Sequence, residues 1–176
     1  LGFEPSVLIG HSVGGMMGMV LAADYPAEFN GLVLVDIAPF ESTGSTRRPP
    51  LPEHFESRVE AKKWLADRFP GFTEYYIKNR LDYAFWQRGG KYYLKPNGNK
   101  VRSGLVIDLW PYLERVKCPV QVYKGVNSDL VTPNSRARMS KMPNVEIIDV
   151  EDTGHMIPQD VPEKFEELIR GFLNRV

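Results

Sequence analysis

Short apolar runs near both ends of the chain predict the strands of a buried sheet. Residues 6–10 and 31–36 form two such runs, and residues 120–125 and 145–150, whose apolar residues are interrupted by a few polar ones, are predicted as a third and a fourth strand. A strand that is covered by helices on both faces is apolar throughout rather than alternately apolar and polar. The pattern therefore predicts an α/β fold with parallel strands joined by helices.

Three segments that follow these runs are expected to be helical. Residues 14–23 follow the first strand and end near Pro26, which gives a strand–helix–strand unit with parallel strands. Thr132 and Pro133 supply an N-cap and a first helical residue for a helix that runs to about Met142. Pro162 opens the last helix, whose apolar residues share the spacing of one packed face: Phe165, Leu168, Ile169, Phe172 and Leu173.

Between these parts the chain changes character, which predicts an insertion at residues 39–108. The proline-rich run at 47–52 cannot form regular structure. Helical stretches dense in aromatic residues follow, and then residues 91–94 and 100–102 flank a turn signal, which predicts a small hairpin. The aromatic residues are Trp64, Phe69, Phe72, Tyr75, Tyr76, Tyr83, Phe85 and Trp86. The core is then expected at residues 1–38 and 109–176.

Composition narrows the classes of function. The chain has 22 basic and 22 acidic residues among 176, so no charge surplus points to a nucleic-acid partner. No apolar run approaches the roughly 20 residues that span a bilayer. One cysteine and three histidines make no structural zinc pattern. We therefore expect no nucleic-acid partner, membrane span, metal or cofactor. The location is unknown, and a single cysteine favours a reducing compartment such as the cytoplasm.

Residues 10–14 read Gly-His-Ser-Val-Gly and predict a nucleophilic serine. The motif lies between a predicted strand and a predicted helix, which is the context in which a G-x-S-x-G sequence forms a sharp turn that exposes its serine. A side chain at Gly10 or Gly14 is expected to clash with the neighbouring strand or helix. Ser12 is the expected nucleophile, and the Val13 N–H is expected to face a developing oxyanion. The simpler interpretation is a glycine-rich helix start with an incidental serine.

A serine hydroxyl needs a base, and that base needs a carboxylate. His155 lies in the loop after the fourth strand, at the sheet edge that should also carry Ser12. His11 is expected to point away from the serine, and His54 lies in the insertion. Asp129, in the loop after the third strand, is the expected acid. Asp36, at the end of the second strand, is its rival.

Together these segments resemble the α/β-hydrolase superfamily, in particular its small esterase, lactonase and C–C hydrolase members. The matching segments are residues 8–15, 34–39, 125–129 and 153–155. The resemblance implies a partial α/β-hydrolase fold with strands equivalent to strands 5–8 of the family. It also implies Ser12 as nucleophile, Asp129 as acid and His155 as base, with residues 39–108 as a cap or lid over the pocket.

The chain departs from the family at its front. The family has eight strands, and this chain starts at what looks like the fifth. The His-Gly loop that supplies a second oxyanion donor in the family has no counterpart, because the sequence contains no His-Gly pair. We expect a fragment that lacks about 80–110 residues. Residues 6–10 should then form an exposed strand edge through which the chain could self-associate.

The expected function is that of a serine hydrolase acting on carboxylic esters, thioesters or lactones through an acyl-enzyme. The expected partner is a small-molecule substrate with an acyl group, and the aromatic insertion favours an apolar pocket. Two alternatives stay open. The chain could belong to a ligand-binding, receptor-like homologue with slow or no turnover, or it could be an inactive fragment.

Overall fold

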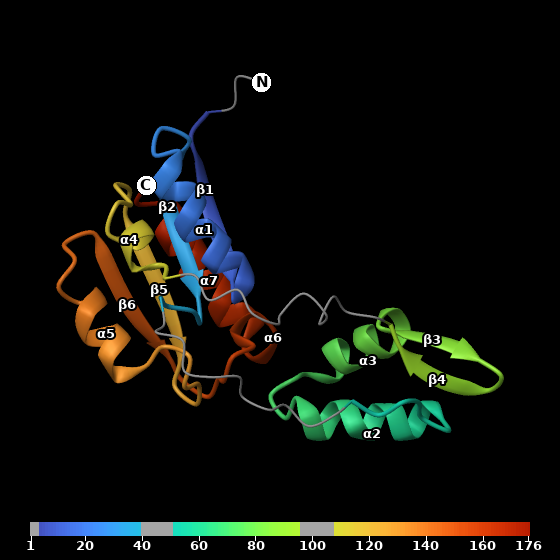
Figure 1. The fold of residues 1–176 in the computed structure, drawn as a ribbon. Helices are drawn as coiled ribbons and strands as arrows, with labels where there is room; N and C mark the ends of the chain where they lie inside the picture. Colours follow the sequence, from blue (N-terminus) through green and yellow to red (C-terminus); the bar gives the residue numbers. More distant parts are fainter. Residues whose placement is uncertain (1–3, 40–50, 96–107) are drawn as a thin grey trace. The chain divides into compact units, whose positions relative to one another are not determined.

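The computed structural model describes residues 4–39, 51–95 and 108–176. The chain divides into two compact units, Leu1–Thr43 with Ile107–Val176 and Gly44–Val106 (Figure 1). The first unit holds the parallel sheet and its helices, and the second holds two helices and a hairpin. We refer to them as the sheet unit and the insertion unit and describe each by itself.

Four parallel strands form the sheet, as the apolar runs predict. Their order across the sheet is β1-β2-β5-β6 (Figure 1). The strands are β1 (Ser6–His11), β2 (Phe29–Val35), β5 (Val120–Gly125) and β6 (Val145–Val150). Because all four run in the same direction, the loops that follow them converge on one edge of the sheet.

Helices cover both faces of this sheet. The described helices of the sheet unit are α1 (Val13–Asp24), α4 (Trp110–Leu113), α5 (Pro133–Met139), α6 (Ile157–Asp160) and α7 (Pro162–Leu173). The Thr132 side chain caps α5 by accepting the Ser135 N–H at 3.1 Å, as predicted. The helix ends at Met139, three residues before the expected Met142. Shorter-range bonds, such as that from the Met142 N–H to the Met139 carbonyl at 2.9 Å, replace the α-helical pattern there.

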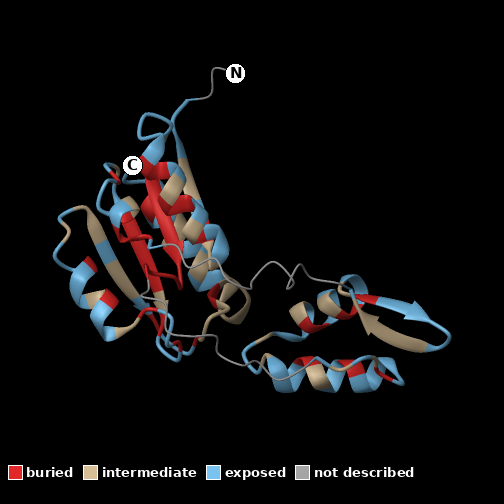
Figure 2. Ribbon diagram, viewed as in Figure 1, coloured by how far each residue is buried: buried red, intermediate tan, exposed pale blue. Residues whose placement is uncertain are grey.

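The central strand β2 is buried along most of its length (Figure 2), and alternate residues enter two separate cores. Leu32 and Leu34 pack on the face that α1, α4 and α5 cover. Val33 and Val35 pack on the opposite face with Phe172 of α7. This alternation follows from the pleat of a strand, and it explains why a strand covered on both faces is apolar throughout. Leu173 of the predicted α7 face is 43% exposed and lies outside this core.

Strand β1 lies at one edge of the sheet. Ile9 in this strand is 44% exposed. On the adjoining helix α1, three apolar residues at four-residue spacing are also exposed: Val13, Met17 and Leu21. An unpaired strand edge beside exposed apolar side chains favours pairing with another chain. Self-association through residues 6–10 stays a prediction.

The insertion unit has a small core of its own. Helices α2 (Arg58–Arg68) and α3 (Glu74–Tyr83) pack against each other and against a two-stranded hairpin (Figure 1). Ser57 caps α2 by accepting the Glu60 N–H at 3.1 Å. The buried residues of this core are Phe55, Ala61, Leu65, Ile77, Leu81 and Phe85, with Trp64, Phe69 and Phe72 packed against them. Much of the aromatic content of the insertion therefore stabilises the unit itself.

The hairpin differs from the predicted one. Strand β4 (Lys91–Leu94) was expected to pair with residues 100–102, which lie outside the described residues. It pairs instead with β3 (Phe85–Arg88), a segment that was expected to be helical. Gly89 and Gly90 join the strands with φ values of 55° and 79°. Two successive residues with positive φ suit a two-residue hairpin turn, which explains why these glycines set the pairing.

Candidate active site

Ser12 occupies a strained turn between β1 and α1. Its φ of 54° and ψ of −121° are unfavourable for a residue with a side chain. The Ser12 N–H donates to the Val35 carbonyl at 3.2 Å, which ties the turn to strand β2. Strain of this kind at an exposed turn is typical of functional residues. The conformation is the one that the G-x-S-x-G pattern predicts.

Close backbone contacts explain two of the neighbouring glycines. A Cβ atom at Gly10 would lie 2.5 Å from the Gly14 carbonyl oxygen, and one at Gly15 would lie 2.8 Å from the Gly10 carbonyl oxygen. Both positions therefore exclude a side chain. The prediction of a similar clash at Gly14 is wrong for the described part of the chain, because no described atom lies within 4 Å of a Cβ placed there.

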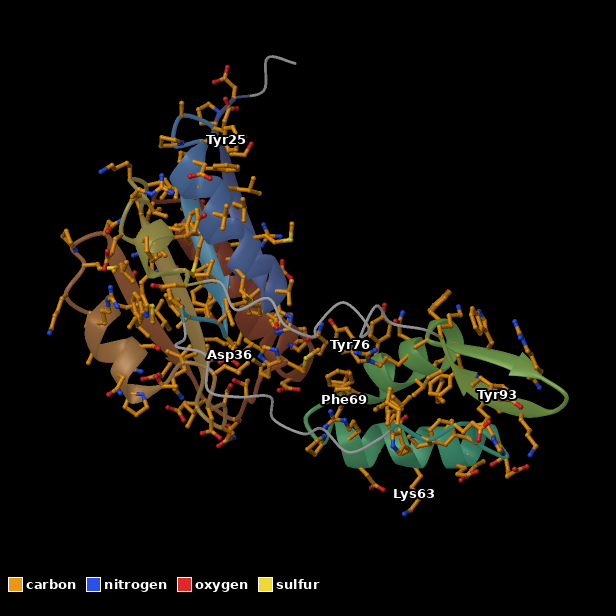
Figure 3. The ribbon with its side chains drawn as sticks, viewed as in Figure 1. Tyr25, Asp36, Lys63, Phe69, Tyr76 and Tyr93 are labelled. Carbon is orange, nitrogen blue, oxygen red and sulfur yellow. The ribbon has the colours of Figure 1, made fainter. Side chains whose placement is uncertain are left out.

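Asp36 follows strand β2 directly and is completely buried (Figure 3). Its φ is 47°, and its N–H donates to the Tyr123 carbonyl at 2.7 Å. Both carboxylate oxygens accept hydrogen bonds. Oδ1 accepts the Gly125 N–H at 3.1 Å, and Oδ2 accepts the Ser128 hydroxyl at 2.5 Å. A buried carboxylate needs such partners, because an unpaired one loses its solvation without compensation.

The His155 imidazole completes this cluster. Its Nδ1 lies 2.8 Å from Asp36 Oδ2, and its side chain is 31% exposed. A carboxylate accepts hydrogen bonds, so this contact favours the tautomer that carries the proton on Nδ1. The opposite ring nitrogen, Nε2, is then free to accept a proton. This is the protonation state that a general base requires.

The structure pairs His155 with Asp36 and not with Asp129. Asp129 is exposed, and it makes no hydrogen bond or ion pair with the described residues of the chain. The loop after β5 was expected to supply the acid through Asp129. It contributes the Ser128 hydroxyl instead, a group that the sequence pattern did not indicate. The geometry therefore favours Asp36 over Asp129 as the carboxylate that orients His155. The signal in the sequence is that Asp36 adjoins a buried strand, whereas Asp129 lies four residues beyond the end of β5.

The loops after β5 and β6 are held tightly together. The Asn127 N–H donates to the Thr153 carbonyl at 2.9 Å. A Cβ atom at Gly125 would overlap the Gly154 carbonyl oxygen, so only glycine permits this approach. The close contact brings Ser128 and His155 to the same carboxylate.

His11 lies beside the base, although sequence reasoning gave it no role. Its Nε2 lies 2.7 Å from the His155 carbonyl oxygen, and the two ring centroids are 4.6 Å apart. Burial lowers the pKa of His11 from its ordinary value, since the charged ring would be poorly solvated. His11 immediately precedes Ser12, so this contact joins the strained turn to the histidine loop.

Two groups at the turn are free to interact with a ligand. The Ser12 hydroxyl makes no hydrogen bond with the described residues. The Val13 N–H is the first amide of α1 and has no acceptor within the helix. In proteins without substrate, hydrogen bonds between a nucleophile and its base are often long and tighten only when substrate binds. The arrangement therefore suits attack by Ser12 with His155 as the base.

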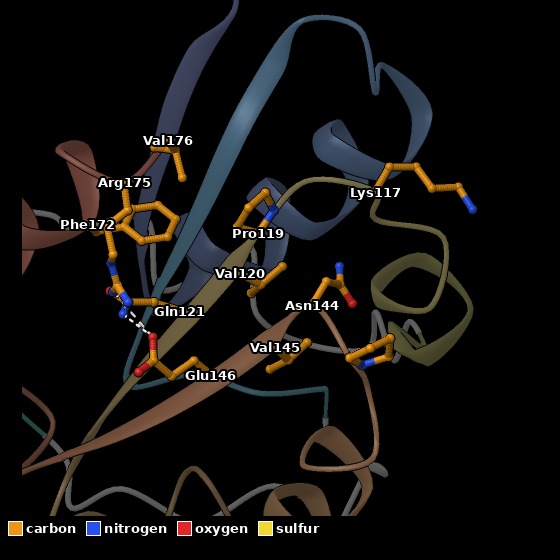
Figure 4. Close-up of a pocket in the computed structure, with 11 residues that line it drawn as sticks. Lys117, Pro119, Val120, Gln121, Asn144, Val145, Glu146, Phe172, Arg175 and Val176 are labelled. Atoms are coloured by element: carbon orange, nitrogen blue, oxygen red, sulfur yellow. Dashed lines mark hydrogen bonds and ion pairs between the residues drawn. The ribbon is translucent and has the colours of Figure 1, made fainter.

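One depression lies elsewhere on the sheet unit. It has a volume of about 430 Å³ and is lined by residues at the amino ends of β5 and β6, including Val120 and Val145 (Figure 4). An ion pair between Arg175 and Glu146, 3.2 Å apart, crosses its wall. The strained serine, the buried carboxylate and the histidine all lie at the opposite ends of the strands. We therefore place the candidate site at those ends and not in this depression.

Metal-binding clusters and membrane-spanning helices are both absent from the described ranges. No group of three or more His, Cys, Asp or Glu side chains in residues 4–39, 51–95 and 108–176 is arranged to hold a metal ion. In the same ranges, none of the helices has the length and apolar character that crossing a membrane requires.

Sequence comparisons place this geometry in a family context. Residues 1–168 match the family described as alpha/beta hydrolase family. The sn-1-specific diacylglycerol lipase ABHD11 of Mus musculus is 27% identical, over 98% of this chain and 60% of that protein. The 2-(acetamidomethylene)succinate hydrolase of Mesorhizobium japonicum is 26% identical, over 96% of this chain and 64% of that protein. The chain thus spans about three fifths of the length of these two relatives.

Solved structures agree on the fold. E-2-(acetamidomethylene)succinate hydrolase superposes with a TM-score of 0.76 at 25% identity, over 97% of this chain and 67% of that one. A putative hydrolase from Rickettsia typhi superposes with a TM-score of 0.81 at 22% identity, over 99% and 64% of the two chains. The predicted partial α/β-hydrolase fold is confirmed. From the family match and the fold together, the chain belongs to the alpha/beta hydrolase family.

Proposed function

We propose that this chain carries the nucleophile, base and acid of a serine hydrolase. Ser12 is the nucleophile, His155 is the base and Asp36 is the carboxylate that orients the base. The observation that carries the proposal is the 2.8 Å contact between His155 Nδ1 and the fully buried Asp36 carboxylate, beside a serine at φ 54°. Asp129 has no comparable contact with the described residues, so we do not assign it this role.

In the first half of the proposed reaction an acyl group moves to the serine. Ser12 Oγ forms a bond to the carbonyl carbon of the substrate while His155 Nε2 takes the hydroxyl proton. The Val13 N–H donates to the oxygen that becomes negative, where the positive end of the α1 dipole adds to the stabilisation. The bond to the leaving group then breaks, and His155 returns the proton to the departing oxygen or sulfur.

The second half releases the acid. A water molecule attacks the acyl-enzyme carbonyl while His155 Nε2 takes one of its protons. The bond to Ser12 Oγ breaks and the serine recovers the proton, which yields a carboxylic acid and the free enzyme. Throughout this cycle Asp36 stabilises the charged imidazole and fixes its orientation, and it remains ionised.

The proposed substrates are carboxylic esters, thioesters and lactones. Two relatives, a diacylglycerol lipase and a 2-(acetamidomethylene)succinate hydrolase, have names that describe substrates with acyl groups. Because the chain spans only part of those relatives, the activity belongs to the whole protein and is proposed as such. The insertion unit is proposed to act as the cap over the acyl group.

A fluorophosphonate probe tests this proposal without knowledge of the natural substrate. We expect covalent labelling at Ser12, located by mass spectrometry of the tryptic peptide, and no labelling of Ser12→Ala. The same protein should hydrolyse p-nitrophenyl acetate or butyrate, again only with Ser12 present. Ser140→Ala, which alters an exposed serine at the end of α5, is the matched control. A folded protein whose Ser12 resists the probe, with stabilising ligand binding but no turnover, would favour the receptor-like alternative.

A further inference from the structure

We infer that His11 is a positioning residue that holds the main chain of His155 and so keeps the base aimed at the nucleophile. The inference rests on the proposed roles of Ser12 and His155. It adds a second point of attachment for His155, beyond the Asp36 contact that orients its ring.

The contact fixes which nitrogen of His11 carries a proton. His11 Nε2 lies 2.7 Å from the carbonyl oxygen of His155. A carbonyl oxygen only accepts hydrogen bonds, so Nε2 must be the donor. The His155 ring has the opposite requirement, because its Nδ1 faces the Asp36 carboxylate at 2.8 Å. Neighbouring histidines thus adopt different tautomers, and each is determined by its own acceptor.

This hydrogen bond matters because of where His11 lies in the chain. His11 is the last residue of β1 and immediately precedes Ser12. Any displacement of the turn that carries Ser12 is therefore transmitted to the His155 main chain, and the two loops move together. Other hydrogen bonds also hold the histidine loop near this point. The Gly154 N–H donates to Asp160 Oδ2 at 3.2 Å, and the Thr153 carbonyl accepts the Asn127 N–H at 2.9 Å.

Ring packing is a second component of the contact. The centroids of the two imidazoles are 4.6 Å apart and their planes are inclined by 37°. The titratable groups that act electrostatically on His11 are His155 and Asp36. A neutral His11 is the favourable partner during catalysis, since a charged one would repel the imidazolium that forms on His155. Burial favours that neutral state.

Two substitutions separate hydrogen bonding from packing. His11→Gln keeps a side-chain N–H that can reach the His155 carbonyl but removes the ring and its titration. His11→Phe keeps a ring of similar size but removes the donor. His54→Gln, in the insertion unit, is the control for loss of a histidine elsewhere. The rate of Ser12 labelling by the fluorophosphonate probe is the first measurement. The ¹H–¹⁵N spectrum of the His155 ring is the second, and it requires no activity.

We expect His11→Phe to slow labelling about tenfold, the typical effect of one lost hydrogen bond, while His11→Gln and His54→Gln remain close to the parent. For p-nitrophenyl butyrate the loss should fall on kcat and not on KM. The His155 Nδ1–H resonance should broaden in His11→Phe alone, while thermal unfolding shows that each variant is folded. Equal losses in His11→Gln and His11→Phe, or a sharp resonance and full labelling rate in His11→Phe, would overturn the inference. If the parent itself is not labelled, the proposed function fails, and the resonance alone decides the role of His11.

Discussion

Two aspartates at the same edge of the sheet have opposite environments. Asp36 adjoins β2, is fully buried and accepts three hydrogen bonds, from Gly125, Ser128 and His155. Asp129 follows β5, is exposed and has no hydrogen-bonded or ionic partner among the described residues. Both lie in loops that topology brings to the candidate site. Topology therefore selects the edge of the sheet, whereas burial and hydrogen bonding select the carboxylate that can orient a base.

Exchanging each carboxylate for an amide should give the largest effect. We expect Asp36→Asn to lower kcat for p-nitrophenyl butyrate by on the order of 10⁴-fold, because an amide in that position favours the wrong tautomer of His155. Asp129→Asn should change kcat less than twofold. Steady-state kinetics of the two variants, with circular dichroism as a check on folding, measures this. Equal losses of kcat in the two variants would contradict the distinct roles of Asp36 and Asp129.

The close approach of the loops should be visible in stability. Gly125→Ala places a Cβ atom against the Gly154 carbonyl, and we expect it to lower the free energy of unfolding by about 1–3 kcal/mol, or more if the backbone cannot move. Gly154→Ala is the matched control. The nearest atom to its Cβ is the Asn127 carbonyl oxygen at 4.0 Å, an ordinary contact. Urea unfolding measures the free energy of unfolding of both variants. Equal values would contradict the observed contact.

The Ser128 hydroxyl should make a smaller contribution to catalysis. Ser128→Ala removes one of the three donors to Asp36, and we expect kcat to fall about tenfold. Ser135→Ala removes another buried hydroxyl, which donates to the Pro39 carbonyl at 3.0 Å and does not touch Asp36. It should affect stability alone. A comparable loss of kcat in both variants would mean that Ser128 acts through folding rather than through the carboxylate.

The smallest expected effect is a pH dependence of stability from His11. Its pKa in the folded state lies below the ordinary value of about 6.5, because burial disfavours the charged ring. As pH falls through that value the unfolded chain binds a proton that the folded chain resists, so stability decreases. Between pH 7 and pH 5 the parent should lose stability faster than His11→Gln. Parallel curves from urea unfolding at each pH would contradict the assigned direction.

The sheet could be predicted from sequence because its physical signal is local. Residues 120–125 and 145–150 are rich in Val, Ile and Tyr with a few polar residues between them, and the structure places β5 and β6 at those residues. The hairpin could not be predicted in the same way. Phe85 and Trp86 fit either a helix or a strand, and the Gly89-Gly90 turn decides between them. The conformational preference of these two glycines therefore determines the structure here more strongly than the aromatic pattern does.

The candidate site was predicted less completely than the fold. The strained turn at Ser12 and the position of His155 follow from motif and topology, since glycine spacing and strand ends are visible in the sequence. Selecting Asp36 required knowledge of burial and of the donors around each carboxylate, which arise only after distant segments pack. The contact between His11 and His155 joins residues 144 positions apart. No local sequence pattern predicts such a contact.

In the proposed mechanism Asp36 holds His155 ready to activate Ser12, and the kinetics of Ser12 labelling are the sharpest test of this role. The rate of fluorophosphonate attachment to Ser12 should be the same in the parent and in Asp129→Asn, and should fall by orders of magnitude in Asp36→Asn. The contrary result is rapid labelling of Asp36→Asn together with slow labelling of Asp129→Asn. That outcome would return the acid to the loop after β5.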